Sequence, residues 1–211
     1  MCKSCVNHLF YADDLVLLAP SPTAVQMLLD ICDRYAQTHA IVFNFKNPFV
    51  CLFLPKSLKL KTPIFYLSDV PLPWVKEHKY LGVILSDDNY DDVDTRRQTR
   101  SLYARGNTTV RKFGNCLDSV KIRLFTTYCI CSYGMSLLTH CHVSCIKSLK
   151  VAYNNCLRYL FRLGRGVSIS AERIKLGIDC FDVVRRKSIF NLWNRLQHSH
   201  NSFIRSIVNS L

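Results

Sequence analysis

Two adjacent aspartates lie between two apolar runs in the stretch Phe10-Tyr11-Ala12-Asp13-Asp14-Leu15-Val16-Leu17-Leu18-Ala19. Short apolar runs joined by a polar pair predict a β-hairpin with the two carboxylates at its tip. An Asp-Asp pair in a turn is most often structural, because its side chains bond nearby backbone groups. A rigid tip can also present a carboxylate to a divalent ion, since Mg²⁺ takes one or two carboxylates together with substrate phosphates. The stretch therefore predicts either a plain turn or part of a metal site.

A helix follows this hairpin in the predicted order of elements. Ser21 is suited to the N-cap and Pro22 to the first helical position. One apolar face recurs at helical spacing. Its members are Val25, Leu28, Leu29, Cys32 and either Tyr35 or Ala36.

The rest of the chain predicts strands first and helices afterwards. Residues 41–54 predict one or two strands, residues 58–75 a proline-punctuated extended segment, and Lys79-Tyr80-Leu81-Gly82-Val83-Ile84-Leu85 a short strand. From Val93 the pattern is helical almost to the end. One stripe has a clear helical period. It comprises Ile146, Leu149, Tyr153, Cys156, Leu157 and Leu160.

Several aromatic residues in the second half also recur at helical spacing. This spacing predicts that they belong to the core, although exposed aromatic rings can stack on nucleic-acid bases. They are Tyr153, Tyr159, Phe161, Phe190 and Trp193.

Composition points to a polyanionic partner. The 211 residues are 49% hydrophobic, which is enough for a packed core, and carry 28 Lys and Arg against 15 Asp and Glu, a net charge of +13. Such a surface favours nucleic acid or an anionic membrane and disfavours an acidic scaffold. Residues 1–95 have a net charge of −3 and residues 96–211 of +16, with the acidic run 87–94 at the boundary. This asymmetry predicts two functional units.

Cysteine usage and hydropathy predict the compartment. The 11 cysteines are scattered and odd in number, and no secretory signal precedes Asp13. We expect reduced thiols, mostly buried, in a cytoplasmic or nuclear protein. The uncharged residues 124–145 are too polar for the ~20 apolar residues of a membrane span, so no membrane is expected as a partner.

Tyr11-Ala12-Asp13-Asp14 and its flanks resemble the active-site hairpin of reverse transcriptases (RNA-directed DNA polymerases), in the form found in non-LTR (LINE-type) retrotransposons. Further segments resemble the family in the same order, so that the resemblance covers nearly the whole chain. They are the helix after Ser21-Pro22 with Val42-Phe43-Asn44-Phe45-Lys46 (palm helix and strand), Lys79 to Leu85 (primer-grip strand), Arg96 to Cys116 (start of the thumb) and Ser188 to Leu211 (the stretch beyond it).

The resemblance implies an α+β fold in three parts. Residues 1–95 would form a partial palm, a small antiparallel sheet with one helix. Residues 96–165 would form a basic helical thumb, and residues 166–211 a helical extension. In the family, the fingers and the palm strand with the first catalytic aspartate precede this hairpin, whereas only ten residues precede Tyr11. We therefore expect a fragment of a reverse-transcriptase domain, inactive without the N-terminal fingers and palm half as a partner.

The resemblance also implies roles for individual residues. Asp13 would be the catalytic metal ligand, holding Mg²⁺ for two-metal nucleotidyl transfer, with Asp14 beside it. Tyr11 and Ala12 would place the hairpin beneath the primer end. Lys46 matches a lysine near the phosphates of the incoming nucleotide, although Asn44-Phe45-Lys46-Asn47 departs from the usual pattern, and a solvated strand end is an equal alternative. The primer strand would pack on Tyr80, Leu81 and Gly82.

A basic cluster at the start of the predicted helical part predicts phosphate contacts. Such contacts make binding independent of sequence and dependent on salt, and an RNA template or RNA–DNA hybrid is the expected partner. Its members are Arg96, Arg97, Arg100, Arg111, Lys112, Lys121 and Arg123. A basic triplet, Arg185-Arg186-Lys187, is also compatible with nuclear entry.

Metal sites outside the hairpin are not expected. Cys2 and Cys5 have the spacing of half a zinc site, and so, more loosely, does the cluster His140-Cys141-His142 with Cys145. Neither matches a zinc-finger spacing. The acidic run 87–94 is better suited to the N-terminus of the following helix, where carboxylates oppose the positive end of the helix dipole.

Two functions remain open from the sequence. The first is a reverse-transcriptase fragment in which Asp13 is catalytic once the rest of the active site is supplied. The second is a non-catalytic, basic nucleic-acid-binding remnant in which Asp13 is idle.

Overall fold

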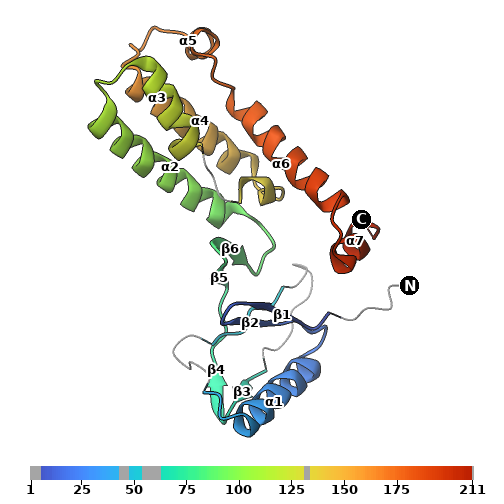
Figure 1. Cartoon of the computed structure of the whole chain (residues 1–211). Coiled ribbons are helices and arrows are strands. Elements are labelled where there is room, and N and C mark those ends of the chain that lie inside the picture. The colour runs from blue at the N-terminus through green and yellow to red at the C-terminus, as the bar shows by residue number, and fades with distance from the viewer. Residues whose placement is uncertain (1–5, 43–47, 54–62, 131–133, 211) are drawn as a thin grey trace. The chain divides into compact units, whose positions relative to one another are not determined.

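The computed structural model describes residues 6–42, 48–53, 63–130 and 134–210 (Figure 1). The chain divides into two compact units, residues 1–76 and 77–209. The described residues form small antiparallel sheets and seven α-helices, so the α+β class is confirmed. The expected division into 1–95, 96–165 and 166–211 is a functional one and stays a prediction.

The first unit begins with the predicted hairpin. Strand β1 (His8–Tyr11) pairs antiparallel with β2 (Asp14–Leu17), in a register that sets Tyr11 opposite Asp14. Ala12 and Asp13 form the two-residue turn, and Ala12 has a φ of 52°. A positive φ at the first turn position suits the right-handed twist of a tight hairpin.

Helix α1 (Pro22–Thr38) begins where the sequence predicts. Ser21 is the N-cap, its Oγ accepts a hydrogen bond from the Ala24 amide at 3.3 Å, and Pro22 is the first helical residue. The inner face buries Leu29 and Ala36. Of the two alternatives at the end of this face, Ala36 is therefore the inward residue.

The described part of the proline-punctuated segment forms a second hairpin rather than a single extended stretch. Strand β3 (Phe65–Leu67) pairs with β4 (Val70–Leu72) across a turn at Ser68 and Asp69, both with positive φ. The Gln26 side chain of α1 accepts from the Tyr66 amide at 3.0 Å and donates to its carbonyl at 2.9 Å. The small core of this unit consists of Leu29, Phe65, Leu67 and Leu72.

The strands expected in residues 41–54 are not found in the described part of that range, 41–42 and 48–53. Only Val50 contributes there, through an isolated bridge to Trp74. Residues 43–47 lie outside the described residues.

The second unit opens with a hairpin where the sequence predicts one strand. Strand β5 (Glu77–Tyr80) pairs with β6 (Val83–Ser86), and the chain reverses at Leu81 and Gly82. The prediction of a continuous strand over Lys79–Leu85 is therefore wrong. The reason is local: Leu81 (φ 44°) and Gly82 (φ 84°) are both left-handed, as the tightest hairpin turns require.

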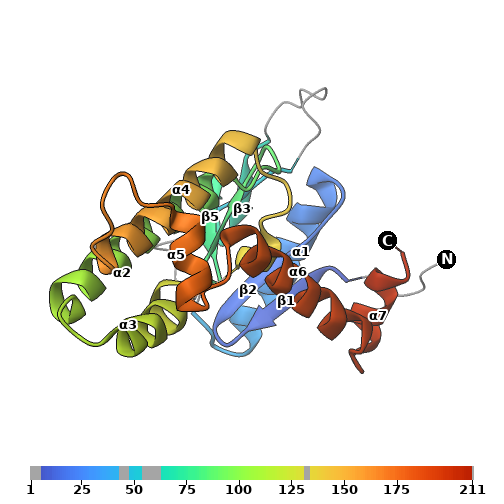
Figure 2. The same ribbon diagram turned by 90° about the horizontal axis from the view of Figure 1, so that it is seen from above.

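The body of the second unit is a helical core. It contains α2 (Asp92–Phe113), α3 (Asp118–Leu124), a π-helical turn (Phe125–Cys129), a 3₁₀ turn (Met135–Leu137) and α4 (Val143–Leu160). Helices α2 and α4 lie side by side (Figures 1 and 2). The stripe predicted on α4 is confirmed, with Ile146 at its edge. Its buried members are Leu149, Tyr153, Cys156, Leu157 and Leu160.

Three helices complete the second unit: α5 (Ile169–Leu176), α6 (Phe181–Gln197) and α7 (Ser202–Val208). The Tyr153 hydroxyl donates to the Asp179 carbonyl at 2.7 Å, and Arg185 donates to the Leu138 carbonyl at 2.9 Å. These bonds hold the first half of α6, whereas its second half runs beyond the α2–α4 pair towards α7 (Figures 1 and 2). Among the helices of the described residues, none is long and apolar enough to cross a membrane.

Candidate functional site

The β1–β2 hairpin presents its tip to solvent. Phe10 and Tyr11 are 68% and 61% exposed, and Asp13 and Asp14 are exposed as well. Asp13 lies in the turn, and Asp14 is the first residue of β2. The hairpin geometry predicted for these carboxylates is confirmed.

The tip of this hairpin supplies too few ligands to hold a divalent ion by itself. All 15 acidic residues fall within the described ranges. The described residues contain no group of three or more His, Cys, Asp or Glu that could hold a metal. The hairpin therefore offers at most Asp13 and Asp14, and Mg²⁺ would need further oxygen ligands from substrate phosphates or another polypeptide segment.

Lys46, the candidate for a nucleotide phosphate, lies outside the described residues, and its role stays a prediction. Cys2 and Cys5, for which no zinc site is expected, also lie outside them.

The β5–β6 hairpin presents a strained leucine. Tyr80 ends β5, while Leu81 and Gly82 form the turn, so the three candidate primer-grip residues lie at a hairpin tip. Leu81 is 36% exposed and adopts a left-handed φ, which costs a residue with a Cβ roughly 1–2 kcal/mol. Strain of this kind often marks functional positions.

A buried carboxylate ties this hairpin to α2. Asp94 is fully buried, and its Oδ1 accepts from the Ile84 amide at 3.0 Å and from Arg97 Nε at 2.7 Å. Its Oδ2 accepts from Gln98 Nε2 at 2.8 Å. The sequence interpretation treated Asp94 only as part of an acidic helix start. The Arg and Gln at the third and fourth positions after it were the signal for a local partner set.

Two other carboxylates of the acidic run, those of Asp91 and Asp92, bind the His140–His142 segment. The carboxylate of Asp91 accepts from the His140 amide at 2.8 Å, and that of Asp92 accepts from the His142 amide at 2.8 Å. His142 Nδ1 lies 2.5 Å from Asp92 Oδ2. The Tyr90 ring stacks on both imidazoles, with centroids 4.4 and 4.5 Å away.

This contact changes the ionisation of Asp92. Partial burial opposes the charged form, but hydrogen bonds from the backbone and ring of His142 outweigh it and hold the Asp92 pKa below its ordinary value. The acidic run lies at a helix start, as expected, but its carboxylates at Asp91 and Asp92 do more than oppose the helix dipole. Asp91 is the N-cap residue without a side-chain cap bond, and Asp91 and Asp92 instead bind a segment about 50 residues away.

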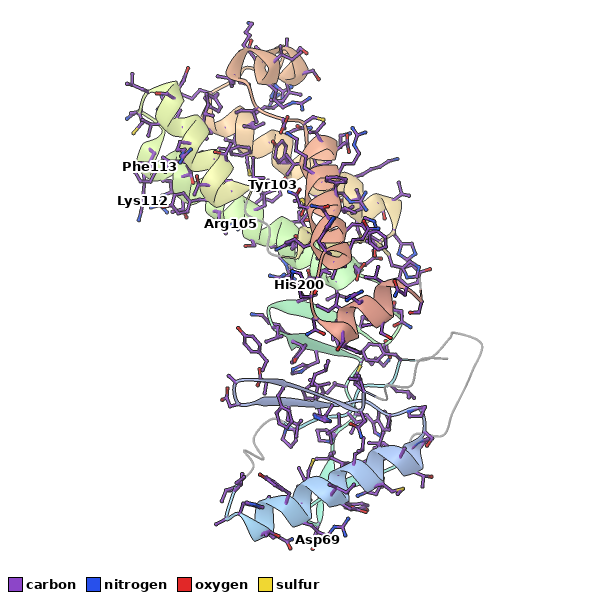
Figure 3. All side chains as sticks on the ribbon, turned by 45° about the vertical axis from the view of Figure 1, so that its right-hand side comes forward. Asp69, Tyr103, Arg105, Lys112, Phe113 and His200 are labelled. Carbon is purple, nitrogen blue, oxygen red and sulfur yellow. The ribbon has the colours of Figure 1, made fainter. Side chains whose placement is uncertain are left out.

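The basic residues divide into an exposed and a structural set. Arg96, Arg100 and Arg111 recur along the outer face of α2, opposite its buried positions, and are exposed. Lys112 and Arg123 are also exposed; Figure 3 shows Lys112 near the end of α2.

Two members of the predicted cluster have internal partners. Arg97 pairs with buried Asp94. Lys121 pairs with Asp118 at 3.1 Å, lies 5.6 Å from the centroid of the Phe161 ring, and its side chain is only 12% exposed. The geometry therefore engages both of these cations within the fold, and it leaves Arg96, Arg100, Arg111, Lys112 and Arg123 as the exposed members of the cluster.

Two of the aromatic residues predicted for the core are instead exposed on α6. Phe190 is 65% and Trp193 41% exposed, whereas Tyr153 is buried and Phe161 half-buried. Tyr159 is 57% exposed. Helical spacing identifies a face of a helix but does not reveal whether another element covers it.

The described cysteines are free thiols, and most of them are half-buried rather than buried, so the expectation of mostly buried thiols is wrong for the described residues. Cys129 and Cys156 are buried in the helical core, and burial raises the pKa of both thiols, that of Cys156 to about 12. Cys180 differs, because hydrogen bonds from the Val183 amide at the start of α6 lower its pKa.

Comparison of the chain with protein-family models, curated proteins and solved structures finds no match.

Proposed function

We propose that the helical unit binds a nucleic-acid duplex, with an RNA–DNA hybrid as the expected ligand, through the outer face of α2. The observation that carries the proposal is the exposed stripe of Arg96, Arg100 and Arg111, which lies opposite the packed face of the helix. No acidic residue occurs between Thr95 and Leu117, so nothing on this stretch repels phosphate. Arginine suits such contacts because its planar fork matches phosphate oxygens.

The length of the stripe fits several phosphates. At 1.5 Å per residue, Arg96 and Arg111 are about 22 Å apart along the helix axis. At about 3.4 Å per nucleotide of one strand, that distance corresponds to roughly six base pairs. Because phosphates are the same in every sequence, the binding is independent of base sequence and decreases steeply with salt.

We further propose that the chain contributes residues to a reverse-transcriptase active site, as its resemblance to non-LTR retrotransposon enzymes implies. Two tight hairpins support this. One exposes Asp13 in its turn, and the other exposes the strained Leu81. In this proposal Asp13 supplies one ligand for Mg²⁺, which would stabilise the charge on the reacting phosphate, and Leu81 contacts the primer strand.

A non-catalytic nucleic-acid-binding protein is the second candidate. It is favoured by the incomplete ligand set, since the described acidic residues form no metal-binding group around Asp13. The two candidates share the α2 surface and differ only in the use of the hairpin.

The binding proposal is tested by fluorescence anisotropy with a labelled 16-base-pair RNA–DNA hybrid. Arg96→Gln/Arg100→Gln removes two charges from the stripe and should weaken binding roughly tenfold or more. The matched control is Lys150→Gln/Lys175→Gln, which removes two charges from α4 and α5, outside the α2 stripe. Equal weakening by both variants, or by neither, contradicts the use of the α2 stripe.

The catalytic proposal is tested by primer extension on an RNA template with Mg²⁺, with and without a fingers-and-palm polypeptide that supplies a further palm aspartate. Extension that requires this polypeptide and is lost in Asp13→Ala supports the reverse-transcriptase candidate. Hybrid binding without extension in any combination supports the non-catalytic candidate.

A further inference from the structure

Helix α6 carries an exposed face that no described element covers. Val183, Arg186, Phe190 and Trp193 follow one another at intervals of three or four residues, which places them along one side of the helix. The opposite side contains Phe181, which is 1% exposed, and Val184, which packs against the helical core. The aromatic face is therefore separate from the face that holds α6 in the fold.

Two shallow depressions lie on α6, the first on this exposed side and the second on another side of the helix. The first, of about 420 Å³, is lined by Val183, Arg186, Lys187 and Phe190 and is almost wholly apolar at its base. The second, of about 480 Å³, is lined by Ser188, Asn191, Asn194 and Arg195 and is about half polar. The aromatic side thus combines an open apolar surface at Val183 and Phe190 with the cations of Arg186 and Lys187.

The charge of this part of the chain has one sign. No acidic residue occurs between Val183 and Leu211, whereas five Arg and Lys do. Lys187 pairs with Asp179 at 2.6 Å, but both side chains are about half exposed or more, and such pairs contribute little and exchange readily with other anions. The Arg186 Nε bonds its own helix at the Asp182 carbonyl. The face therefore complements a polyanion.

We propose that this α6 face is a stacking platform for single-stranded nucleic acid. Bases stack on the rings of Phe190 and Trp193, which are three residues apart and hence neighbours on the helix surface. Arg186 and Lys187 contact the flanking phosphates, and Asn194, four residues after Phe190 and hence its neighbour on the helix surface, can bond a base edge. This surface extends the proposed function, because it would hold the unpaired strand next to a duplex bound elsewhere on the protein.

Single-stranded nucleic acid fits the face better than a membrane surface does. A membrane-binding helix needs a continuous apolar side. Here the cations of Arg186 and Lys187 interrupt the apolar side next to Phe190. Rings beside cations are the pattern of base-stacking grooves.

The test uses the intrinsic fluorescence of Trp193 in the full chain, titrated with 12-nucleotide oligo(dT) and oligo(rU). Stacking of bases on Trp193 should quench its emission in a saturable way. Trp193→Phe should remove this quenchable emission and leave only the emission of Trp74. Phe190→Leu/Trp193→Leu should weaken oligonucleotide binding at least fivefold, as measured by anisotropy. The control, Tyr128→Leu/Tyr159→Leu, removes two rings that are 59% and 57% exposed elsewhere in the same unit and should leave binding unchanged.

The outcomes separate this inference from the duplex proposal. If Trp193 is quenched while the RNA–DNA hybrid does not bind, the duplex proposal fails and the platform stands. If the hybrid binds but no oligonucleotide quenches Trp193, the platform is wrong. It is also wrong if vesicles of phosphatidylcholine and phosphatidylserine, but not oligonucleotides, change the Trp193 emission, because α6 would then be a membrane surface.

Discussion

Gly106 of α2 faces Cys156 of α4 so closely that a Cβ on Gly106 would lie 2.6 Å from the Cys156 Sγ. The Cys156 side chain has no room to withdraw, since it is 2% exposed and its Sγ also contacts the Leu102 carbonyl at 3.7 Å. The glycine is what allows the two longest helices of the second unit to approach at this point. At this position the glycine permits close helix packing, although glycine inside a helix is usually destabilising.

Gly106→Ala should therefore destabilise the protein, against the usual trend. In an open helix this change stabilises by about 1 kcal/mol. Here the overpacking should lower the free energy of unfolding by roughly 1–3 kcal/mol. Urea denaturation followed by circular dichroism measures it. Gly106→Ala/Cys156→Ala should lose less than the sum of the two single variants; additivity would show that the two side chains do not compete for the same space.

Asp94→Ala should be among the most damaging single substitutions. It leaves Arg97 without its carboxylate and removes the acceptor for the Ile84 amide and for Gln98. Breaking a buried pair in this way costs about 3 kcal/mol, which a shift in the urea midpoint would report. Asp118→Ala is the control, because that carboxylate is 64% exposed and its pair with Lys121 is worth about 1 kcal/mol or less. Similar losses in both variants would contradict the account of Asp94.

The Asp92–His142 contact should weaken in acid. Because the folded-state pKa of Asp92 lies below its unfolded value, its contribution to stability is complete above the unfolded pKa, about 3.9, and is lost as the pH falls through the folded pKa. The difference in unfolding free energy between the wild type and Asp92→Asn should thus shrink as the pH falls below about 4. A difference that stays the same at pH 2.5 would mean that the charge of Asp92 contributes nothing.

Leu81→Asn should separate stability from function. An Asn-Gly pair is the preferred sequence for a turn with two left-handed residues, so the variant should be more stable by up to about 1 kcal/mol. If Leu81 contacts the primer strand, the same variant should bind a primed RNA template less tightly.

The control for this change is Leu117→Asn. Leu117 is 77% exposed and does not belong to the hairpin, so binding should be unchanged. A Leu81→Asn variant that is stabilised and binds as tightly as the wild type would remove the primer-contact role.

Local signals made much of this fold predictable. The Asp13–Asp14 hairpin follows from polar residues between apolar runs, the start of α1 from Ser21 and Pro22, and the buried stripe of α4 from its helical period. Each depends only on residues close in sequence.

The features that were not predicted depend on contacts or on unfavourable local geometry. The β5–β6 turn was missed because leucine disfavours the left-handed conformation that Leu81 adopts. The burial of Asp94 was missed because it depends on the Ile84 amide of β6, an element that the sequence does not show to be packed against α2. The exposure of Phe190 and Trp193 was missed because the period of a helix is the same whether or not another element covers it.

The most direct test of the central proposal is the salt dependence of RNA–DNA hybrid binding. If α2 contacts phosphates, the logarithm of the association constant should fall linearly with the logarithm of the salt concentration, with a slope of about −0.9 for each phosphate engaged. Arg96→Gln/Arg100→Gln should make this slope shallower by the contribution of about two phosphate contacts. Lys150→Gln/Lys175→Gln should leave the slope unchanged. A wild-type affinity that does not fall between about 50 and 200 mM salt, or an unchanged slope in the α2 variant, would contradict nucleic-acid binding by this helix.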